Sequence, residues 1–209
     1  MKRISVLLLA LMMPLMPAAA DPVLVELFAS QNCAACPKAF RTLKSAAEQD
    51  DVMVLTWSVD YWDYLATADP MAMPESKHRQ EAYVDRFEIR GPYTPQAVFD
   101  GAVECPGNKQ SRVAQWIDDR LETEALPIAL EPTDNGIAIS GDLTLPRDVL
   151  LVHYLGDYEG AMPNPVVKLE KLGVWSGGDQ IFPVTCENDC VVLVQETGVG
   201  EVLAVQVMP

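Results

Sequence analysis

The stretch VLVELFASQNCAACP, residues 23–37, decides the fold that the sequence predicts. Its first six residues are nearly all apolar, which is typical of a short buried strand. Two cysteines in a Cys-x-x-Cys spacing, Cys33 and Cys36, follow the strand. Pro37 then begins a segment whose apolar residues recur at helical spacing as far as Gln49. We therefore expect a strand, a cysteine pair and a helix in immediate succession.

This placement would make the first cysteine reactive. At the N-terminus of a helix, unpaired backbone N–H groups and the helix dipole favour a negative charge, and the thiolate is the reactive form of cysteine. A proline disfavours the helical conformation in the residue before it, so we expect Cys36 to be the helix cap and Pro37 the first helical residue. Cys33 is accordingly predicted to be the more exposed and more acidic thiol, and Cys36 the resolving one.

Apolar runs and helical periodicity continue to alternate as far as Leu126. The expected elements are a strand over 52–59, a helix over 75–87, two strands within 95–103 joined by a turn at Asp100-Gly101, and a helix over 111–124. This order, with a Cys-x-x-Cys after the first strand, is the thioredoxin arrangement. In that arrangement we expect the Thr94–Pro95 bond to be cis and to face the dithiol. The alternative is a trans proline at the first residue of a strand, which sheets tolerate.

The pattern changes after Leu126. Short apolar runs between turn residues predict strands over 128–130, 137–140, 143–145, 149–154, 191–194 and 202–207. They indicate a small antiparallel, sandwich-like β region packed on the first part. The predicted fold class is therefore an α/β thioredoxin-like domain followed by a small antiparallel β region.

The three remaining cysteines are assigned by their spacing. Cys186 and Cys190 lie in a polar loop before a predicted strand, and we expect them to form a structural disulfide, with a second redox-active pair as the alternative. Cys105 is then left over, either as a buried free thiol or as an intermolecular handle. Zinc is disfavoured because it usually needs four ligands, and His78 and His153 are both distant from the cysteines in sequence. We expect no metal and no cofactor.

The first twenty residues have the layout of a secretory signal peptide. Lys2 and Arg3 form a basic start, residues 4–16 are an apolar run, and residues 18–20 are alanines that suit cleavage before Asp21. A membrane anchor is the alternative, but the run is too short to span a bilayer and prolines interrupt it. We therefore expect a periplasmic or secreted protein with no stable membrane insertion after signal removal.

Composition limits the possible functions. The chain has 209 residues, of which 49% are hydrophobic and 22% charged, as in an ordinary folded protein. Its formal net charge of −15 would repel phosphate backbones, which argues against nucleic-acid binding. The expected organisation is a signal peptide over 1–20, a thioredoxin-like domain over 21–126 and the antiparallel β region over 127–209.

Five motifs stand in a characteristic order along the chain. They are Glu26–Pro37, Val59–Leu65, Arg79–Tyr83, Tyr93–Gln96 and Leu172–Gly177. Together they resemble the motifs of a family of bacterial secreted thioredoxin-like proteins of unknown function. The resemblance covers most of the chain after residue 20. It implies the fold and a dithiol site but no substrate, and Cys105, Cys186 and Cys190 depart from the family's pattern.

Aromatic and polar residues are expected beside the dithiol. The candidates for binding a partner are Tyr61, Trp62, Tyr93, Thr94 and Gln96. The alternative is that the aromatic side chains only pack the connection after the second strand. Asp60 is a candidate proton shuttle for the second cysteine, with capping of a turn or helix as its alternative, and Pro95 is expected to shape the site.

Three functional hypotheses follow. The first is an exported thiol–disulfide oxidoreductase in which Cys33 attacks and Cys36 resolves a mixed disulfide with an exported protein or a small thiol. The second is a binding protein whose two thiolates hold a soft metal such as Cu(I). The third is a non-catalytic module in which the Cys33–Cys36 bond is a structural staple.

Overall fold

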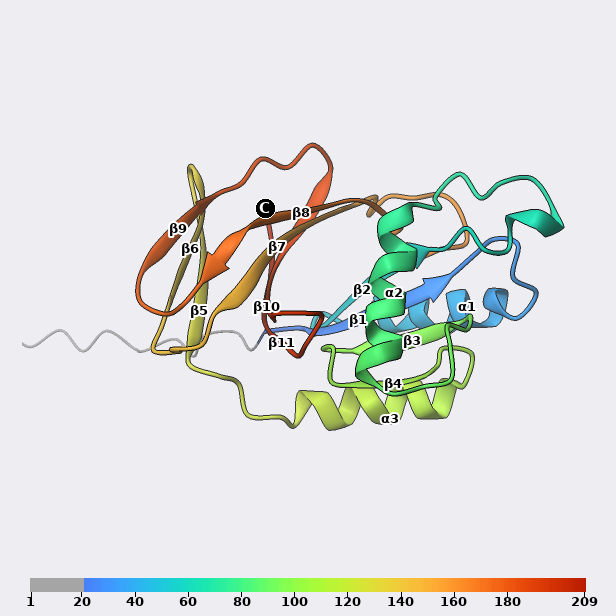
Figure 1. The fold of residues 1–209 in the computed structure, drawn as a ribbon, viewed down its shortest axis with the longest axis horizontal. Helices are drawn as coiled ribbons and strands as arrows, with labels where there is room; N and C mark the ends of the chain where they lie inside the picture. The colour runs from blue at the N-terminus through green and yellow to red at the C-terminus, as the bar shows by residue number, and fades with distance from the viewer. Residues whose placement is uncertain (1–20) are drawn as a thin grey trace, which may run out of the picture.

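The structure is a computed structural model that describes residues 21–209 (Figure 1). The predicted signal peptide, residues 1–20, lies outside the described residues. Within this range the elements are β1 (Val23–Ala29), α1 (Cys36–Ala46), β2 (Val52–Ser58), a 3-10 helix η1 (Asp63–Leu65), α2 (Pro74–Arg86), β3 (Gln96–Phe99), β4 (Val103–Pro106), α3 (Gln110–Leu121), β5 (Ile128–Thr133), β6 (Gly136–Gly141), β7 (Arg147–Tyr154), β8 (Val166–Trp175), β9 (Gln180–Pro183), β10 (Asp189–Glu196) and β11 (Val202–Val207).

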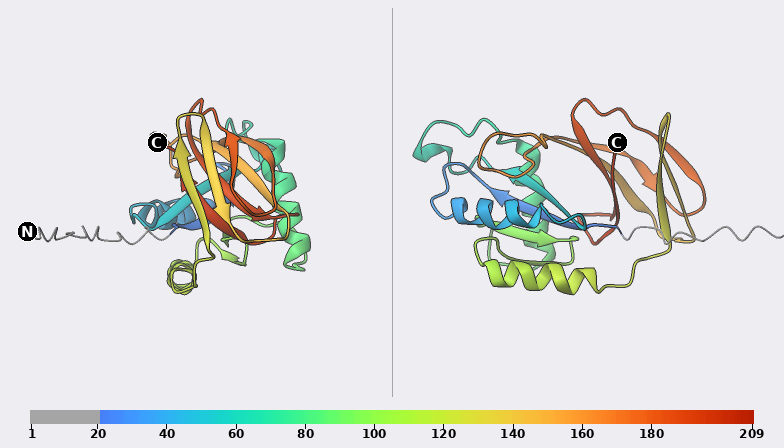
Figure 2. Two further views of the ribbon diagram at one scale, coloured as in Figure 1. Left: turned by 90° about the vertical axis from the view of Figure 1, so that its left-hand side faces the viewer. Right: turned by 180° about the vertical axis from the view of Figure 1, so that it is seen from behind.

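The strands form three sheets. The first has the order β2-β1-β3-β4, the second β11-β10-β7-β8, and the third β5-β6-β9. In the first sheet β1 pairs with β2 in parallel and with β3 in antiparallel fashion. Figures 1 and 2 show the third sheet at one end of the molecule and the helices around the first sheet at the other.

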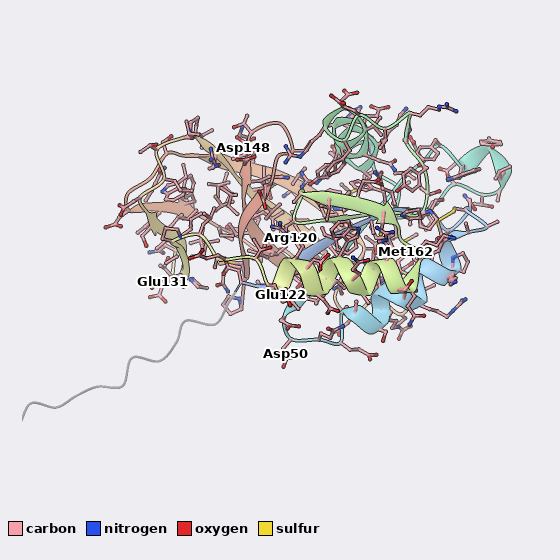
Figure 3. All side chains as sticks on the ribbon, turned by 90° about the horizontal axis from the view of Figure 1, so that it is seen from below. Asp50, Arg120, Glu122, Glu131, Asp148 and Met162 are labelled. Carbon is pink, nitrogen blue, oxygen red and sulfur yellow. A yellow bond between two sulfur atoms is a disulfide. The ribbon has the colours of Figure 1, made fainter. Side chains whose placement is uncertain are left out.

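Three apolar clusters hold these layers together. The first lies between one face of the first sheet and the helices α1 and α3, which lie side by side when the molecule is seen from below (Figure 3). The second joins the opposite face of the first sheet to the second sheet. The third fills the space between the second and third sheets, where Trp175 is fully buried. The second sheet is therefore a middle layer covered on both faces.

The strand β10 shows this double burial in its sequence. Val191 and Leu193 face the first sheet, whereas Cys190, Val192 and Val194 face the third. Both alternating sets are apolar because neither face meets water. Apolar residues on both faces therefore place this strand inside the molecule and not at its edge.

The predicted fold class is wrong. Eleven strands and three α-helices make the described chain mostly β, and the second and third sheets are wholly antiparallel. Even the first sheet has only one parallel pair, β1 with β2. The expectation of an α/β thioredoxin-like class came from the order of elements in the first hundred residues. It treated the seven later strands as a small attachment, although they form two of the three sheets.

The order of elements in the first part is nevertheless as predicted. Each expected strand and helix between residues 23 and 124 is present, with ends that move by a few residues. The Asp100-Gly101 turn joins β3 to β4, and both residues have positive φ, 45° and 63°. Gly101 is required there, because a Cβ atom would lie 2.2 Å from the carbonyl oxygen of Gly200.

The later part departs more from expectation. The predicted strand over 143–145 is not a strand, and β8 and β9 were not predicted. The strand β8 lies at the edge of its sheet with a mixture of buried and exposed positions, so it lacks a clear period of two. No helix within residues 21–209 combines the length and the apolar character that crossing a membrane requires.

A buried ion pair connects the layers. Glu26 on β1 is fully buried and accepts hydrogen bonds from Arg79 on α2, at 2.5 and 2.9 Å. The Tyr83 hydroxyl also donates to Glu26, and Arg79 donates to Gln195 on β10 at 3.0 Å. The guanidinium lies 5.1 Å from the centre of the Trp57 ring. Burial opposes the charge of Arg79, but the adjacent Glu26 carboxylate raises the pKa of this guanidinium further above its usual value.

Candidate functional site

The cysteine pair lies in a short turn between β1 and α1. Cys33 donates its backbone N–H to the carbonyl oxygen of Ser30, and Cys36 donates to that of Cys33. The two cysteines form a disulfide with their Cα atoms 5.4 Å apart. The helix begins at Cys36 itself, with Ala35 as its cap, so the predicted cap is one residue too late. Pro37 is tolerated in the first turn because the amide it lacks would have no partner within the helix.

The pair is more buried than the sequence predicts. Cys33 is 3% exposed and Cys36 is not exposed at all. Both belong to the apolar cluster between the first sheet and the helices, together with Phe40 and Met162, and Trp62 packs against this cluster. Cys33 is the more exposed of the two, as predicted, but only a small part of its surface is open to a reactant.

A buried carboxylate, Asp69, holds the turn before Cys33. It accepts hydrogen bonds from the backbone N–H of Gln31 at 2.8 Å and from the Ser58 hydroxyl at 2.7 Å. It also accepts the backbone N–H of Met71 at 3.0 Å, which forms an Asx turn. Since Ser58 ends β2 and Gln31 follows β1, Asp69 ties the connection after β2 to the dithiol turn.

Sequence reasoning missed Asp69 and selected Asp60. The Asp60 side chain is exposed and makes no hydrogen bond to any residue in the described range. Its backbone carbonyl accepts the N–H of Asp63. The Asp69-Pro70 sequence, which is typical of a turn, is the local signal that could have directed attention to Asp69.

The predicted proline lies at the same end of the first sheet. The Thr94–Pro95 bond is cis, as expected. Phe28 is opposite Gln96 in the β1–β3 register, so the residue before β3 lies beside the end of β1 that leads to Cys33. The Thr94 hydroxyl accepts a hydrogen bond from the Trp62 indole at 2.7 Å. This bond joins the connection after β2 to the proline loop.

A second polar network connects the predicted binding residues. Gln80 on α2 donates to the carbonyl oxygen of Tyr93 at 2.8 Å and to the Gln96 side chain at 3.0 Å, and it accepts from the Tyr61 hydroxyl at 3.2 Å. The Tyr93 hydroxyl donates to Glu104 on β4. Burial, together with this carboxylate, raises the pKa of the Tyr93 phenol.

The structure therefore brings the predicted binding residues together. It adds Gln80 and Glu104, whose roles only the spatial arrangement shows. Gln96 is fully buried, so it positions its neighbours and presents no free amide at the surface. His78 is exposed on α2.

An exposed aromatic segment follows the buried part of this network. Tyr64 is 77% exposed and stacks on Trp62 with ring centres 6.3 Å apart, and the adjacent Leu65 is also exposed. Asn32, the residue before Cys33, donates to the Asp63 side chain at 3.1 Å and to the carbonyl oxygen of Thr67. The aromatic segment is therefore attached directly to the dithiol turn.

The other cysteines occupy separate places. Cys186 and Cys190 form the predicted disulfide, and Cys190 lies in the cluster between the second and third sheets. Cys105 on β4 is a buried free thiol, which is one of its two predicted states. Burial and the adjacent Glu104 carboxylate raise the pKa of Cys105 to about 12, although Arg112 opposes the shift.

The buried thiol leads to a prediction about alkaline stability. An ordinary cysteine has a pKa of about 8.5, so the unfolded chain releases this proton before the folded chain does. The free energy of unfolding should therefore fall from about pH 8.5 upward, until Cys105 ionises in the folded protein at about pH 12. Urea unfolding of the oxidised protein at pH 7.5 and pH 10 measures the loss. In Cys105→Ala the loss should be smaller, and an equal loss in both proteins would contradict the assignment.

Comparisons with known proteins identify a family and a fold. The family described as "Protein of unknown function (DUF1223)" matches residues 24–158. A crystal structure of a protein from Agrobacterium tumefaciens, a structural genomics target, is similar with a TM-score of 0.76. The two are 23% identical, and the match covers 91% of this chain and 96% of that one, which shows a shared fold. No curated protein matches the sequence.

Proposed function

The chain belongs to the DUF1223 family of proteins of unknown function, and from the arrangement of its own residues we propose that it is an exported thiol–disulfide oxidoreductase acting through Cys33 and Cys36. The observation that carries the proposal is the position of the bonded pair. It lies in a short turn after a central strand, and of its two cysteines only Cys33 has exposed surface. Export is inferred from the N-terminal signal pattern.

The proposed reaction is thiol–disulfide exchange. In the reduced protein the Cys33 thiolate attacks one sulfur of a disulfide R–S–S–R, which forms a Cys33–S–S–R bond and releases one thiolate. The Cys36 thiolate then attacks the Cys33 sulfur, forms the Cys33–Cys36 bond and releases the second thiolate. Two electrons pass from the protein to the substrate, and the reverse sequence oxidises a substrate dithiol.

The surroundings support this exchange. Asp69 holds the turn through Gln31, so the backbone before Cys33 is fixed. The exposed Tyr64 and Leu65 offer a surface against which apolar groups of the substrate can pack, since aromatic residues are enriched at protein interfaces. The substrates in this proposal are exported proteins or small thiols.

A structural staple is the second candidate. The burial of both cysteines favours it, because the side chains that cover the disulfide keep a reductant in solution away from it. A structural disulfide would only stabilise the folded chain, and for so short a loop it would contribute less than about 3 kcal/mol.

Trapping separates the two functions. In Cys36→Ser the resolving thiol is absent, so a mixed disulfide at Cys33 cannot be released by its neighbour. Incubation with an extract of exported proteins and with small disulfides should give covalent adducts that appear in mass spectra and disappear with reductant. Cys33→Ser, the matched control, should give far fewer because Cys36 is fully buried. A staple would give no adducts in either variant. A Cu(I)-binding protein would give no covalent adducts, and its affinity for the metal would fall in both Cys36→Ser and Cys33→Ser.

A further inference from the structure

A groove lies beside the dithiol, between helix α1 and residues 158–161. Its volume is about 390 Å³, and the dithiol side of its wall is formed by Gln31 and Pro37. Gln31 precedes Cys33 by two residues, and Pro37 directly follows Cys36. We call this space the dithiol groove. A ligand in it would contact residues on either side of the Cys33–Cys36 turn, whereas neither cysteine belongs to the lining itself.

The groove carries positive charge in an acidic protein. Arg41 and Lys44 lie on the exposed face of α1 and form its wall, and none of the described residues that line it is acidic. Helix α1 contains three basic residues and no acidic one, whereas the whole chain has a net charge of −15. Within residues 21–209 neither Arg41 nor Lys44 forms an ion pair. The nearby Glu159 belongs to the segment that forms the opposite wall but faces a neighbouring cavity.

The opposite wall is apolar and closely packed. Tyr158 packs against the cluster that contains Cys33 and Cys36. Its ring lies on Gly160, where a Cβ atom would be only 2.1 Å from the ring carbon Cε1. Any side chain at position 160 would therefore displace the ring and reshape the groove.

We infer that the dithiol groove binds the carboxylate-bearing part of a low-molecular-weight thiol or its disulfide, whose sulfur then faces Cys33. This inference rests on the proposed function and names its substrate class. The volume lies within the range of about 300–1,000 Å³ that is usual for small-molecule sites. Arg41 and Lys44 can donate charge-assisted hydrogen bonds to the ligand's carboxylates, and Tyr158 offers an apolar surface for its carbon atoms.

Thiol–disulfide exchange follows the binding step. Reduced protein and one disulfide R–S–S–R give the Cys33–Cys36 disulfide and two molecules of R–SH, with two protons and two electrons passing from the protein to the substrate. Arg41 and Lys44 act on the carboxylates of R and take no part in the transfer, so they are positioning residues. Their removal should slow the reaction only for substrates that carry negative charge.

The charge dependence can be measured with three disulfides. Glutathione disulfide is anionic, 2-hydroxyethyl disulfide is neutral and cystamine is cationic. The reduced variant Arg41→Gln/Lys44→Gln should be oxidised by glutathione disulfide about tenfold more slowly than the reduced parent, since each exposed charge changes the rate by roughly threefold. Its rate with the neutral disulfide should stay within about twofold of the parent's, and its rate with cystamine should rise. Lys38→Gln, on the same helix but outside the groove, is the matched control and should change none of these rates beyond about twofold. An equal loss for all three disulfides would overturn the inference.

A second measurement separates this inference from the proposed function. S-methyl glutathione has no free thiol, so it can bind but cannot exchange. Calorimetry with the oxidised protein should detect binding that weakens in Arg41→Gln/Lys44→Gln and in Gly160→Ala. Such binding without exchange of any disulfide would overturn the oxidoreductase proposal but support the ligand site in the dithiol groove. Disulfide exchange without charge-dependent binding would support the oxidoreductase proposal and overturn the ligand site.

Discussion

Replacing Arg79 with methionine is expected to lower the free energy of unfolding by about 3–5 kcal/mol, the usual cost of removing one partner of a buried ion pair. Arg79 supplies two hydrogen bonds to Glu26, which is fully buried on the central strand β1. Methionine fills similar space but leaves that carboxylate without its partner charge. Urea unfolding followed by fluorescence or circular dichroism measures the loss.

Two further variants show whether the charge is the cause. The double variant Arg79→Met/Glu26→Gln removes both charges and should recover part of the lost stability. The surface pair of Lys168 with Glu170, at 2.9 Å and with both side chains nearly half exposed, is the matched control. Lys168→Met should cost only a small fraction of that loss, because water and salt screen an exposed pair. Losses of similar size in Arg79→Met and Lys168→Met would show that the buried pair contributes no more to stability than a surface pair.

Replacing Asp69 with alanine should lower the free energy of unfolding by about 2–4 kcal/mol, because four donors would lose a buried acceptor. These donors are the backbone N–H groups of Gln31 and Met71, the side-chain amide of Gln31 and the hydroxyl of Ser58. The turn before Cys33 should also loosen. Hydrogen exchange of the amides at residues 31–33 should therefore become faster relative to that of β1.

Asp60→Ala is the matched control for this prediction. Asp60 lies nine positions earlier in the same connection, but it is exposed and its side chain has no hydrogen-bond partner in the described range. Its replacement should change stability by no more than about 0.5 kcal/mol. A larger effect for Asp60→Ala than for Asp69→Ala would mean that the wrong carboxylate has been assigned to the dithiol turn.

Local patterns predicted much of the first part of the chain. The apolar run before Cys33, the helical spacing after Pro37 and the Asp100-Gly101 turn each depend on a few neighbouring residues. Such signals do not show how the strands assemble. The β1–β3 pairing joins residues about seventy positions apart, and the edge strand β8 has no regular alternation, so the fold class inferred from element order was wrong.

The candidate site divides in the same way. The cysteine spacing, the proline before β3 and the aromatic residues after β2 are local motifs, so they are visible in the sequence, and the cis isomer of that proline was inferred from the expected order of elements. The burial of both cysteines, the hydrogen bonds between Asp69 and their turn and the position of Arg41 and Lys44 opposite Tyr158 are visible only in three dimensions. These properties depend on residues that are far apart in sequence: Gln31 and Asp69 are separated by 38 positions, and Arg41 and Tyr158 by more than 100. Spacing along the chain does not encode such distances, whereas the packing of sheets and helices around the dithiol sets them.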